Sequence, residues 1–261
     1  MHRNFRAAVR ALWVMVMIVL VMASCVPIKK QVYLQTEESD TTKSEYILDN
    51  TPSYTLQPGN NLYIKVFSVD DELYDFFNLG FGTAGNIYYD AAVYLNSYSV
   101  NDSGKVELPF IGEIFVKDLT LEQAKNKIQQ RIDKYLKNTM IIVKLVNYTV
   151  TVVGEVQRPG QFKVYQDQIS IYEVLALAGD MTTFAKRDDV ILVRKTDKGS
   201  KIHHLNLLED KFLESPYFYI MPDDVVYVRP VKGKNFAFSS FPYTLVISSI
   251  SLAIALFALF K

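Results

Sequence analysis

The sequence has a single cysteine, Cys25, among 261 residues. A disulfide needs two cysteines, so a fold held together by intrachain disulfides is excluded. Neither sign of charge is in excess, because 28 Lys and Arg residues balance 28 Asp and Glu residues. A basic surface for nucleic acid is therefore not indicated, and we expect no nucleic-acid partner.

The residue types that catalysis or metal binding would need are also scarce. The histidines are His2 and the neighbours His203 and His204, which would point to opposite faces of a strand and make a poor metal pair. Three acidic runs could supply paired carboxylates for glycoside hydrolysis: Asp70–Glu72, Asp188–Asp189 and Asp223–Asp224. Each lies at a predicted turn or strand edge, where acids are usually solvated or capping. With no glycine-rich phosphate loop or nucleophile elbow, we predict neither an enzyme nor a cofactor.

The N-terminus is typical of an exported lipoprotein. Three arginines precede the apolar run Ala11–Met22, which is short for a transmembrane helix. Val21–Cys25 is similar to a bacterial lipobox, so residues 1–24 are predicted to be a signal peptide and Cys25 the lipidated residue. The alternative is an uncleaved anchor with an incidental cysteine. Residues 25–50 are polar and are predicted to be a tether that carries the folded body away from the membrane.

A first domain is predicted over residues 51–147. A Pro58–Gly59 turn precedes a strand with alternating Leu62, Ile64 and Val66. A hairpin over residues 100–114 is expected to turn at Asn101–Gly104. Thr120 and Gln123 form a capping box that opens a helix. The predicted buried face of this helix comprises Leu121, Ala124, Ile128, Ile132 and Tyr135. Residues 140–146 form a further strand, and the aromatic stretch 73–97 has no assigned structure.

A second domain is predicted over residues 148–230, beginning with the β-branched strand Tyr148–Val153. Pro159 and Gly160 suit the centre of a type II turn, with Gly160 at positive φ. Ser170 and Glu173 form another capping box, opening a helix that ends at Gly179, before a strand over residues 190–193. The structural turn and cap residues are therefore predicted to be Gly154, Pro159, Gly160, Ser170, Glu173 and Gly179.

The order of these motifs resembles a known family. Val-x-Gly-Glu-Val-x-x-Pro-Gly, Leu-Ala-x-Ala-Gly and Val-x-Leu-x-Arg resemble the soluble-ligand-binding β-grasp (SLBB) domain of bacterial outer-membrane polysaccharide export proteins of the Wza type. The Leu-x-Pro-Gly strand start and the Val-x-x-x-Gly-x-Val-x-Leu-Pro-x-x-Gly hairpin resemble the N-terminal domain of the same proteins. Asn60 stands where that family usually has aspartate, and we expect it to weaken a turn hydrogen bond. Asp223 stands where the family favours glycine.

The C-terminus is predicted to be a transmembrane helix over residues 241–260. The uncharged run Tyr243–Phe260 would be about 27 Å long at ~1.5 Å per residue, enough for a thin hydrocarbon layer. Small or weakly polar residues form one stripe on this helix: Thr244, Ser248, Ser251, Ala255 and Ala258. The stripe fits either an ordinary anchor, in which serines are tolerated, or a face for helix packing or a channel lumen. The resemblance favours the second interpretation.

The resemblance therefore implies an α+β fold: an export-type strand and helix domain, one SLBB β-grasp domain, and a C-terminal transmembrane helix. The implied function is a subunit of a ring-forming homo-oligomeric outer-membrane channel that exports capsular or extracellular polysaccharide. It would be lipid-anchored at the periplasmic side and would work with an inner-membrane co-polymerase or chain-length regulator. Larger relatives have several SLBB units, so a partner is expected to complete the periplasmic path. The alternatives are a lipoprotein that binds a soluble ligand or cell-wall glycan, and a periplasmic glycan-modifying enzyme.

Overall fold

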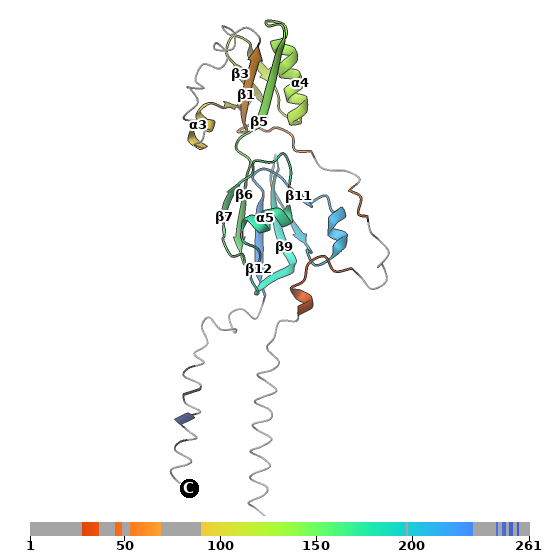
Figure 1. The fold of residues 1–261 in the computed structure, drawn as a ribbon, viewed down its shortest axis with the longest axis vertical. Helices are drawn as coiled ribbons and strands as arrows, with labels where there is room; N and C mark the ends of the chain where they lie inside the picture. Colours follow the sequence, from red (N-terminus) through yellow and green to blue (C-terminus); the bar gives the residue numbers. More distant parts are fainter. Residues whose placement is uncertain are drawn as a thin grey trace, which may run out of the picture.

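The computed structural model of the chain describes residues 28–36, 45–48, 53–68, 90–196 and 198–231, with isolated helical positions between 244 and 255. Several predicted features lie outside the described residues: the signal peptide 1–24, Cys25, Asp70–Glu72 and Ala258. The predicted division into two α+β domains agrees with the fold. Figure 1 shows them one above the other along the long axis, each with its own core. Leu145 packs against both cores, so it marks the junction.

The first domain is built on the strand that the alternating pattern predicted. β1 (Asn61–Ser68) pairs antiparallel with β2 (Tyr98–Ser99) on one side and with β5 (Thr139–Leu145) on the other. Leu62, Ile64 and Val66 of β1 are buried, as predicted. A short helix, α3 (Asp90–Leu95), precedes β2 within the stretch for which no structure was predicted.

The helix α4 (Leu121–Ile132) begins at the predicted capping box. The Thr120 hydroxyl accepts a hydrogen bond from the Gln123 backbone, and the Gln123 side chain accepts one from the Thr120 backbone. Ala124, Ile128 and Ile132 are buried as predicted, and Leu121 is half-buried. The prediction for Tyr135 is wrong: its side chain is 57% exposed. Because α4 ends at Ile132, the helical spacing does not continue to residue 135.

The predicted hairpin needs a correction. The turn at residues 101–104 exists, since the Gly104 N–H donates to the Asn101 carbonyl at 2.8 Å. It connects β2 to β3 (Lys105–Leu108), but the ladder partner of β3 is β4 (Gly112–Phe115), so the hairpin turns at residues 109–111. The two short strands cover the first core with Val106, Leu108 and Ile114.

The second domain contains a mixed five-stranded sheet in the order β10-β9-β12-β6-β7. The strands are β6 (Thr149–Gly154), β7 (Gly160–Lys163), β9 (Ala185–Thr196), β10 (Gly199–Leu205) and β12 (Val225–Pro230). β12 runs parallel to β6, and the other pairs are antiparallel. Two short strands, β8 (Ile169–Ser170) and β11 (Tyr219–Ile220), pair with each other, and a 3-10 turn, η2, spans Asp210–Glu214.

The helix α5 (Ile171–Leu177) has the predicted capping box and end. The Ser170 hydroxyl accepts a hydrogen bond from the Glu173 N–H, and the Glu173 carboxylate accepts one from the Ser170 N–H at 2.7 Å. The Ser170 hydroxyl also donates to this carboxylate at 2.7 Å, and the two hydrogen bonds that the carboxylate accepts lower the pKa of Glu173. Its inner face is formed by four buried apolar residues at helical spacing: Ile171, Val174, Leu175 and Ala178. Gly179 follows at φ +76°, as a helix stop requires.

The predicted turn glycine is a second correction. The φ angle of Gly160 is not positive. Gly160 is the first residue of β7 and pairs with Val152 of β6. Of the two glycines that flank this turn, Gly154 is the one in the left-handed region, at φ +96°. A Cβ there would lie 2.0 Å from the Val228 carbonyl oxygen of β12. The chain turns over residues 155–159, because Gly154 lets β6 bend where β12 approaches.

Part of the predicted tether is bound to the second domain. Residues 28–36, which include the 3-10 turn η1 (Ile28–Lys30), form a segment that we call the strap. The Tyr33 hydroxyl donates to Asp180, and Gln35 forms a bridge with Glu209. Further along, the Tyr46 hydroxyl donates to Asp210 at 2.6 Å. These residues of the predicted tether, 25–50, therefore contact the second domain, and its role in carrying the folded body away from the membrane stays a prediction.

The predicted C-terminal helix lies mostly outside the described residues. Thr244, Ser248, Ser251 and Ala255 of the small stripe are helical and exposed. Within the part of the chain that the structure describes, no helix has both the length and the apolar character needed to cross a membrane. The structure therefore gives the predicted transmembrane helix no support.

Candidate functional site

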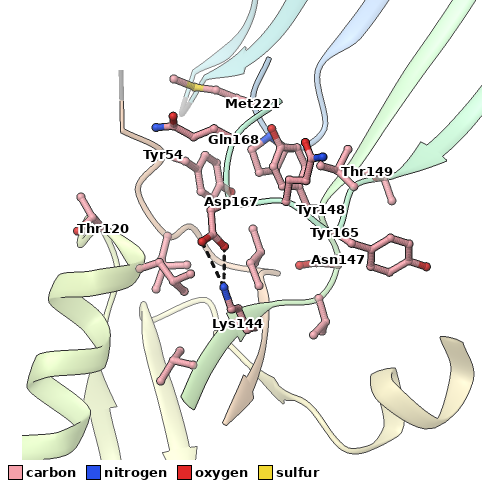
Figure 2. A pocket seen from close by; sticks show the side chains of 18 of the residues that line it. Tyr54, Thr120, Lys144, Asn147, Tyr148, Thr149, Tyr165, Asp167, Gln168 and Met221 are labelled. Atoms are coloured by element: carbon pink, nitrogen blue, oxygen red, sulfur yellow. Dashed lines mark hydrogen bonds and ion pairs between the residues drawn. The ribbon is translucent and has the colours of Figure 1, made fainter. Parts of the chain in front are cut away.

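A cleft of about 1380 Å³ lies at the junction of the two domains. From the first domain it is lined by Tyr54, Tyr94 of α3, the start of α4 and the end of β5. From the second domain it is lined by the start of β6, the end of β7 at Lys163, the loop 164–168 between β7 and β8, and residues 219–222. Figure 2 shows these side chains around the cleft, with an ion pair near its centre.

The ion pair joins the two walls of the cleft. Lys144 Nζ of β5 lies 2.9 Å and 3.2 Å from the carboxylate oxygens of Asp167 in the β7–β8 loop. The two side chains are 55% and 70% exposed, so the pair contributes only about 0–1 kcal/mol to stability. Its main effect is chemical: the lysine charge and the carboxylate charge largely cancel within the cleft.

The floor of the junction is held by Asn147. Its side-chain oxygen accepts from the Asn61 N–H at 2.9 Å, and its side-chain N–H donates to the Gly59 carbonyl at 2.9 Å. The Val146 N–H also donates to the Asn61 carbonyl at 2.9 Å. The connection between β5 and β6 is therefore tied to the turn before β1, with no flexible linker between the domains.

Asn60 keeps the turn hydrogen bond that we expected it to weaken. Its side-chain oxygen accepts from the Gln57 N–H at 2.8 Å and from the Tyr54 hydroxyl at 2.9 Å. The side chain is buried, and burial raises the pKa of Tyr54, which lines the cleft. An amide oxygen can accept the same two bonds as a carboxylate, so the substitution of aspartate by asparagine preserves the turn.

On the second-domain side, Tyr148 anchors the wall. Its hydroxyl donates to the Ile220 carbonyl at 2.5 Å. Burial raises the pKa of Tyr148, and the nearby charge of Asp224 raises it further. Asp224 is 1% exposed and accepts from Arg194 in a bidentate pair, with the shortest contact at 2.7 Å. Asp224 also accepts from the Met221 N–H at 2.8 Å, while Asp223 takes φ +64° in the turn. Asp224 is therefore buried and not solvated, but it caps the turn at Met221, which is the other role expected of these acids.

The second acidic pair is likewise structural. Asp189 lies 2.8 Å from Lys186, 2.6 Å from Arg229 and 2.6 Å from His204. These partners, with the His204 hydrogen bond first, lower the pKa of Asp189 to about 2. A carboxylate held ionised in this way is a poor general acid. His203 points to the other face of β10 and stacks on Tyr217, as expected of adjacent strand residues. In the described ranges, no cluster of three or more ligating side chains could hold a metal.

The residues predicted from the SLBB motif shape the second domain but do not line the cleft. Gly154, Pro159, Gly160, Ser170, Glu173 and Gly179 are all absent from its walls. The cleft residues that sequence reasoning missed are Asn147, Lys144, Tyr165 and Asp167. Tyr165, which is 84% exposed, and Asp167 belong to the polar run Tyr165–Gln168 between two strands, and this run is the one sequence signal that could have marked them.

The family models divide the chain at this junction. A model described as polysaccharide biosynthesis/export protein matches residues 48–146, and an SLBB domain model matches residues 149–203. The chain belongs to the polysaccharide export family. The two matches are separated only by Asn147 and Tyr148, the residues that tie the domains together and anchor the cleft wall.

Curated relatives carry the same family description. The chain is 24% identical over 157 residues to "EPS I polysaccharide export outer membrane protein EpsA" of Ralstonia nicotianae, and 24% identical over 162 residues to the protein of the same name from Ralstonia solanacearum. Each match covers 59% of this chain, and 41% and 42% of the respective relatives. The chain thus matches about two fifths of the length of these relatives. Both names describe polysaccharide export proteins of the outer membrane.

Proposed function

We propose that this export-family chain is a subunit of an oligomeric outer-membrane channel that passes capsular or extracellular polysaccharide from the periplasm to the cell surface. The observation that carries the proposal is the order of an export domain and an SLBB domain in one chain, joined without a linker at Asn147. The names of the curated relatives, which describe export proteins, support the same direction of transport. No covalent chemistry is required of such a subunit, and polymer synthesis and energy would come from an inner-membrane co-polymerase or chain-length regulator.

Membrane attachment in this proposal rests on the sequence. Cys25 would be lipidated after removal of residues 1–24, and residues 241–260 would cross the outer membrane. The small stripe Thr244, Ser248, Ser251, Ala255 and Ala258 would let neighbouring helices approach closely or line the lumen. A protein already held in the membrane by a lipid gains little from a second anchor. This redundancy favours a helix that forms part of the channel wall over a helix that only anchors the chain.

Imaging of the full chain tests the assembly. Detergent-extracted protein should form rings of uniform diameter in negative-stain images. Truncation at Ser240 should leave a folded lipoprotein that no longer restores surface polysaccharide in a strain lacking the gene. Ser248→Leu with Ser251→Leu should disturb assembly, because bulk would fill the small stripe, whereas the control Ile247→Leu should not. Only monomers in the images, with normal export by the truncated protein, would overturn the channel proposal.

The lipid and the topology have their own tests. Mass spectrometry should find the mature chain starting at an acylated Cys25, and Cys25→Ser should leave an unprocessed precursor. An epitope after Lys261 should be reached by antibody on intact cells. A full-length chain with an unmodified Cys25 would remove the lipoprotein part of the proposal. If antibody reaches the tag only after the outer membrane is permeabilised, the prediction that residues 241–260 cross this membrane is wrong.

The cleft favours a second candidate, a lipoprotein that binds a soluble ligand or cell-wall glycan. Its tyrosines and its uncharged polar side chains, such as Asn147, Thr149 and Gln168, can contact the apolar faces and the hydroxyls of sugars. Its volume exceeds the roughly 300–1,000 Å³ of small-molecule pockets, which suits several linked units.

Nuclear magnetic resonance saturation transfer from the full chain to a muramidase digest of peptidoglycan tests this candidate. Tyr165→Ala should abolish the transfer, and Tyr135→Ala, an exposed tyrosine outside the cleft, is the matched control. If the unmodified protein shows no saturation transfer, it does not bind this glycan and the second candidate function is wrong. If the transfer persists in Tyr165→Ala, the protein binds the glycan somewhere other than in the cleft.

A further inference from the structure

The cleft between the two domains already holds one carboxylate on a lysine. Both carboxylate oxygens of Asp167 lie within 3.2 Å of Lys144 Nζ, and the two residues come from opposite walls. Figure 2 shows the two side chains pointing toward each other. Among the described residues, Lys144 is the one hydrogen-bond partner of the Asp167 side chain. Lys144 therefore has both the position and the charge to bind a carboxylate in the cleft.

The Lys144–Asp167 pair is open enough for the carboxylate of a ligand to take the place of Asp167. The two side chains are 55% and 70% exposed. Ion pairs this exposed contribute little to stability, because water screens the charges and ordering the side chains costs entropy. Every residue of the run 165–168 is exposed, so the Asp167 side chain can turn into water without leaving a core contact. Exchanging one carboxylate for another on the same lysine then has little electrostatic cost.

The other charged residues of the cleft favour an acidic ligand. Lys125 and Lys163 line it together with Glu122, and all three are exposed. With the Lys144–Asp167 pair, three lysines and two acids line the cleft, which leaves one positive charge in excess. A ligand that carries a carboxylate would balance this excess, whereas a basic ligand would add to it.

The uncharged part of the cleft suits a sugar. Tyr94 of α3 and Tyr165 of the β7–β8 loop are 63% and 84% exposed and belong to opposite walls. Their rings can pack against the apolar faces of sugar rings, as amphipathic aromatic side chains do at binding surfaces. Gln166 and Gln168 are exposed in the same loop, and each amide can donate to and accept from sugar hydroxyls. A sugar that carries a carboxylate, which is a uronic acid, matches both the charged and the uncharged residues.

We propose that the cleft binds a uronic acid unit of an acidic glycan, and that the carboxylate of this unit replaces Asp167 on Lys144. Asp167 acts as a competitor built into the chain: it pairs with the lysine while the cleft is empty and turns into water when the glycan binds. The inference deepens the second candidate function, since it rests on a glycan entering the cleft. It adds the charge of that glycan and the pair of residues that selects it.

Calorimetric titration of the detergent-solubilised full chain tests the charge of the ligand. The probes are a short oligogalacturonate and its methyl ester, which has the same sugar chain without the negative charges. The acid should bind roughly fivefold more tightly than the ester, and added salt should reduce this preference. Equal binding of the two probes would overturn this inference and leave glycan binding in place, whereas binding of neither would overturn both. An oligoglutamate that binds as tightly as the oligogalacturonate would overturn the assignment to a sugar.

Substitutions in the pair test the exchange of carboxylates. Asp167→Asn should tighten binding of the oligogalacturonate roughly two- to fivefold and leave the ester unchanged, because the competitor is gone. Lys144→Gln should make the acid and the ester bind equally, and adding Asp167→Asn to it should bring no gain. Asp102→Asn and Lys134→Gln make the same charge changes at exposed positions outside the cleft and should have no effect. Weaker binding of the acid by Asp167→Asn, or a gain that persists without Lys144, would overturn the exchange.

Discussion

Replacing Gly154 should be far more damaging than replacing Gly160. At Gly154 an alanine would have to adopt φ near +96°, and its Cβ would meet the Val228 carbonyl oxygen at 2.0 Å and the Tyr227 ring at 2.9 Å. Backbone strain of about 1–3 kcal/mol adds to a packing cost of about 1–3 kcal/mol, giving a loss of about 2–6 kcal/mol. The contact cannot be relieved cheaply, because the Val228 carbonyl belongs to the central strand β12 and also accepts from the Glu155 N–H.

Gly160→Ala is the matched control for Gly154→Ala. A Cβ at Gly160 has no atom within 4 Å, and its φ lies outside the left-handed region, so its effect should stay within about 0.5 kcal/mol. In a domain of this size, each kcal/mol moves the melting temperature by roughly 4–8 °C. Thermal unfolding of the detergent-solubilised full chain, followed by circular dichroism, should therefore separate the two variants by roughly 6 °C or more. Equal melting temperatures, or a larger loss at Gly160, would refute the assignment of the strained glycine.

Three further substitutions probe named contacts. Asp189→Asn should flatten the pH dependence of stability between about pH 4 and pH 2 in an acid titration. The pKa of Asp189 is lowered to about 2, so the stability that its carboxylate contributes is present above its ordinary pKa of 3.8 and is lost as the pH falls. An unchanged acid transition would contradict this. Tyr148→Phe should cost about 1–3 kcal/mol in denaturant unfolding, because the buried Ile220 carbonyl loses its donor; Tyr135→Phe is the neutral control. Ser170→Ala should cost about 0.5–2 kcal/mol through loss of the α5 cap, and a loss near zero would mean that the capping box contributes nothing.

The elements that the sequence predicted well are those set by local pattern. The alternation of Leu62, Ile64 and Val66 and the two capping boxes at Thr120 and Ser170 depend on residues within a few positions of one another. These signals survive folding because the same short-range spacing decides which face is buried. β10 was not predicted, because its residues lie at the edge of the sheet and are mostly exposed, so no apolar alternation marks it.

The features that were missed or misplaced depend on distant partners. The need for glycine at Gly154 comes from Val228, which β12 brings against it. Tyr33 is bound to Asp180, 147 positions along the chain. The cleft combines the end of β5 with the β7–β8 loop, and only the packing of the two domains brings Lys144 to Asp167. No single stretch of sequence contains the information for any of these contacts.

The absence of a linker at Asn147 has a consequence for symmetry. A closed ring of identical copies forms only if every copy repeats the same angle between its neighbours, since small differences in shape accumulate around the circle. A flexible connection would let the two domains of each copy tilt independently, and a ring closed by one domain would leave the other out of register. Three hydrogen bonds join residues 146–147 to residues 59–61 and so fix the point at which the chain leaves the first domain. In the ring proposed above, closure by either domain would then restrict the placement of the other.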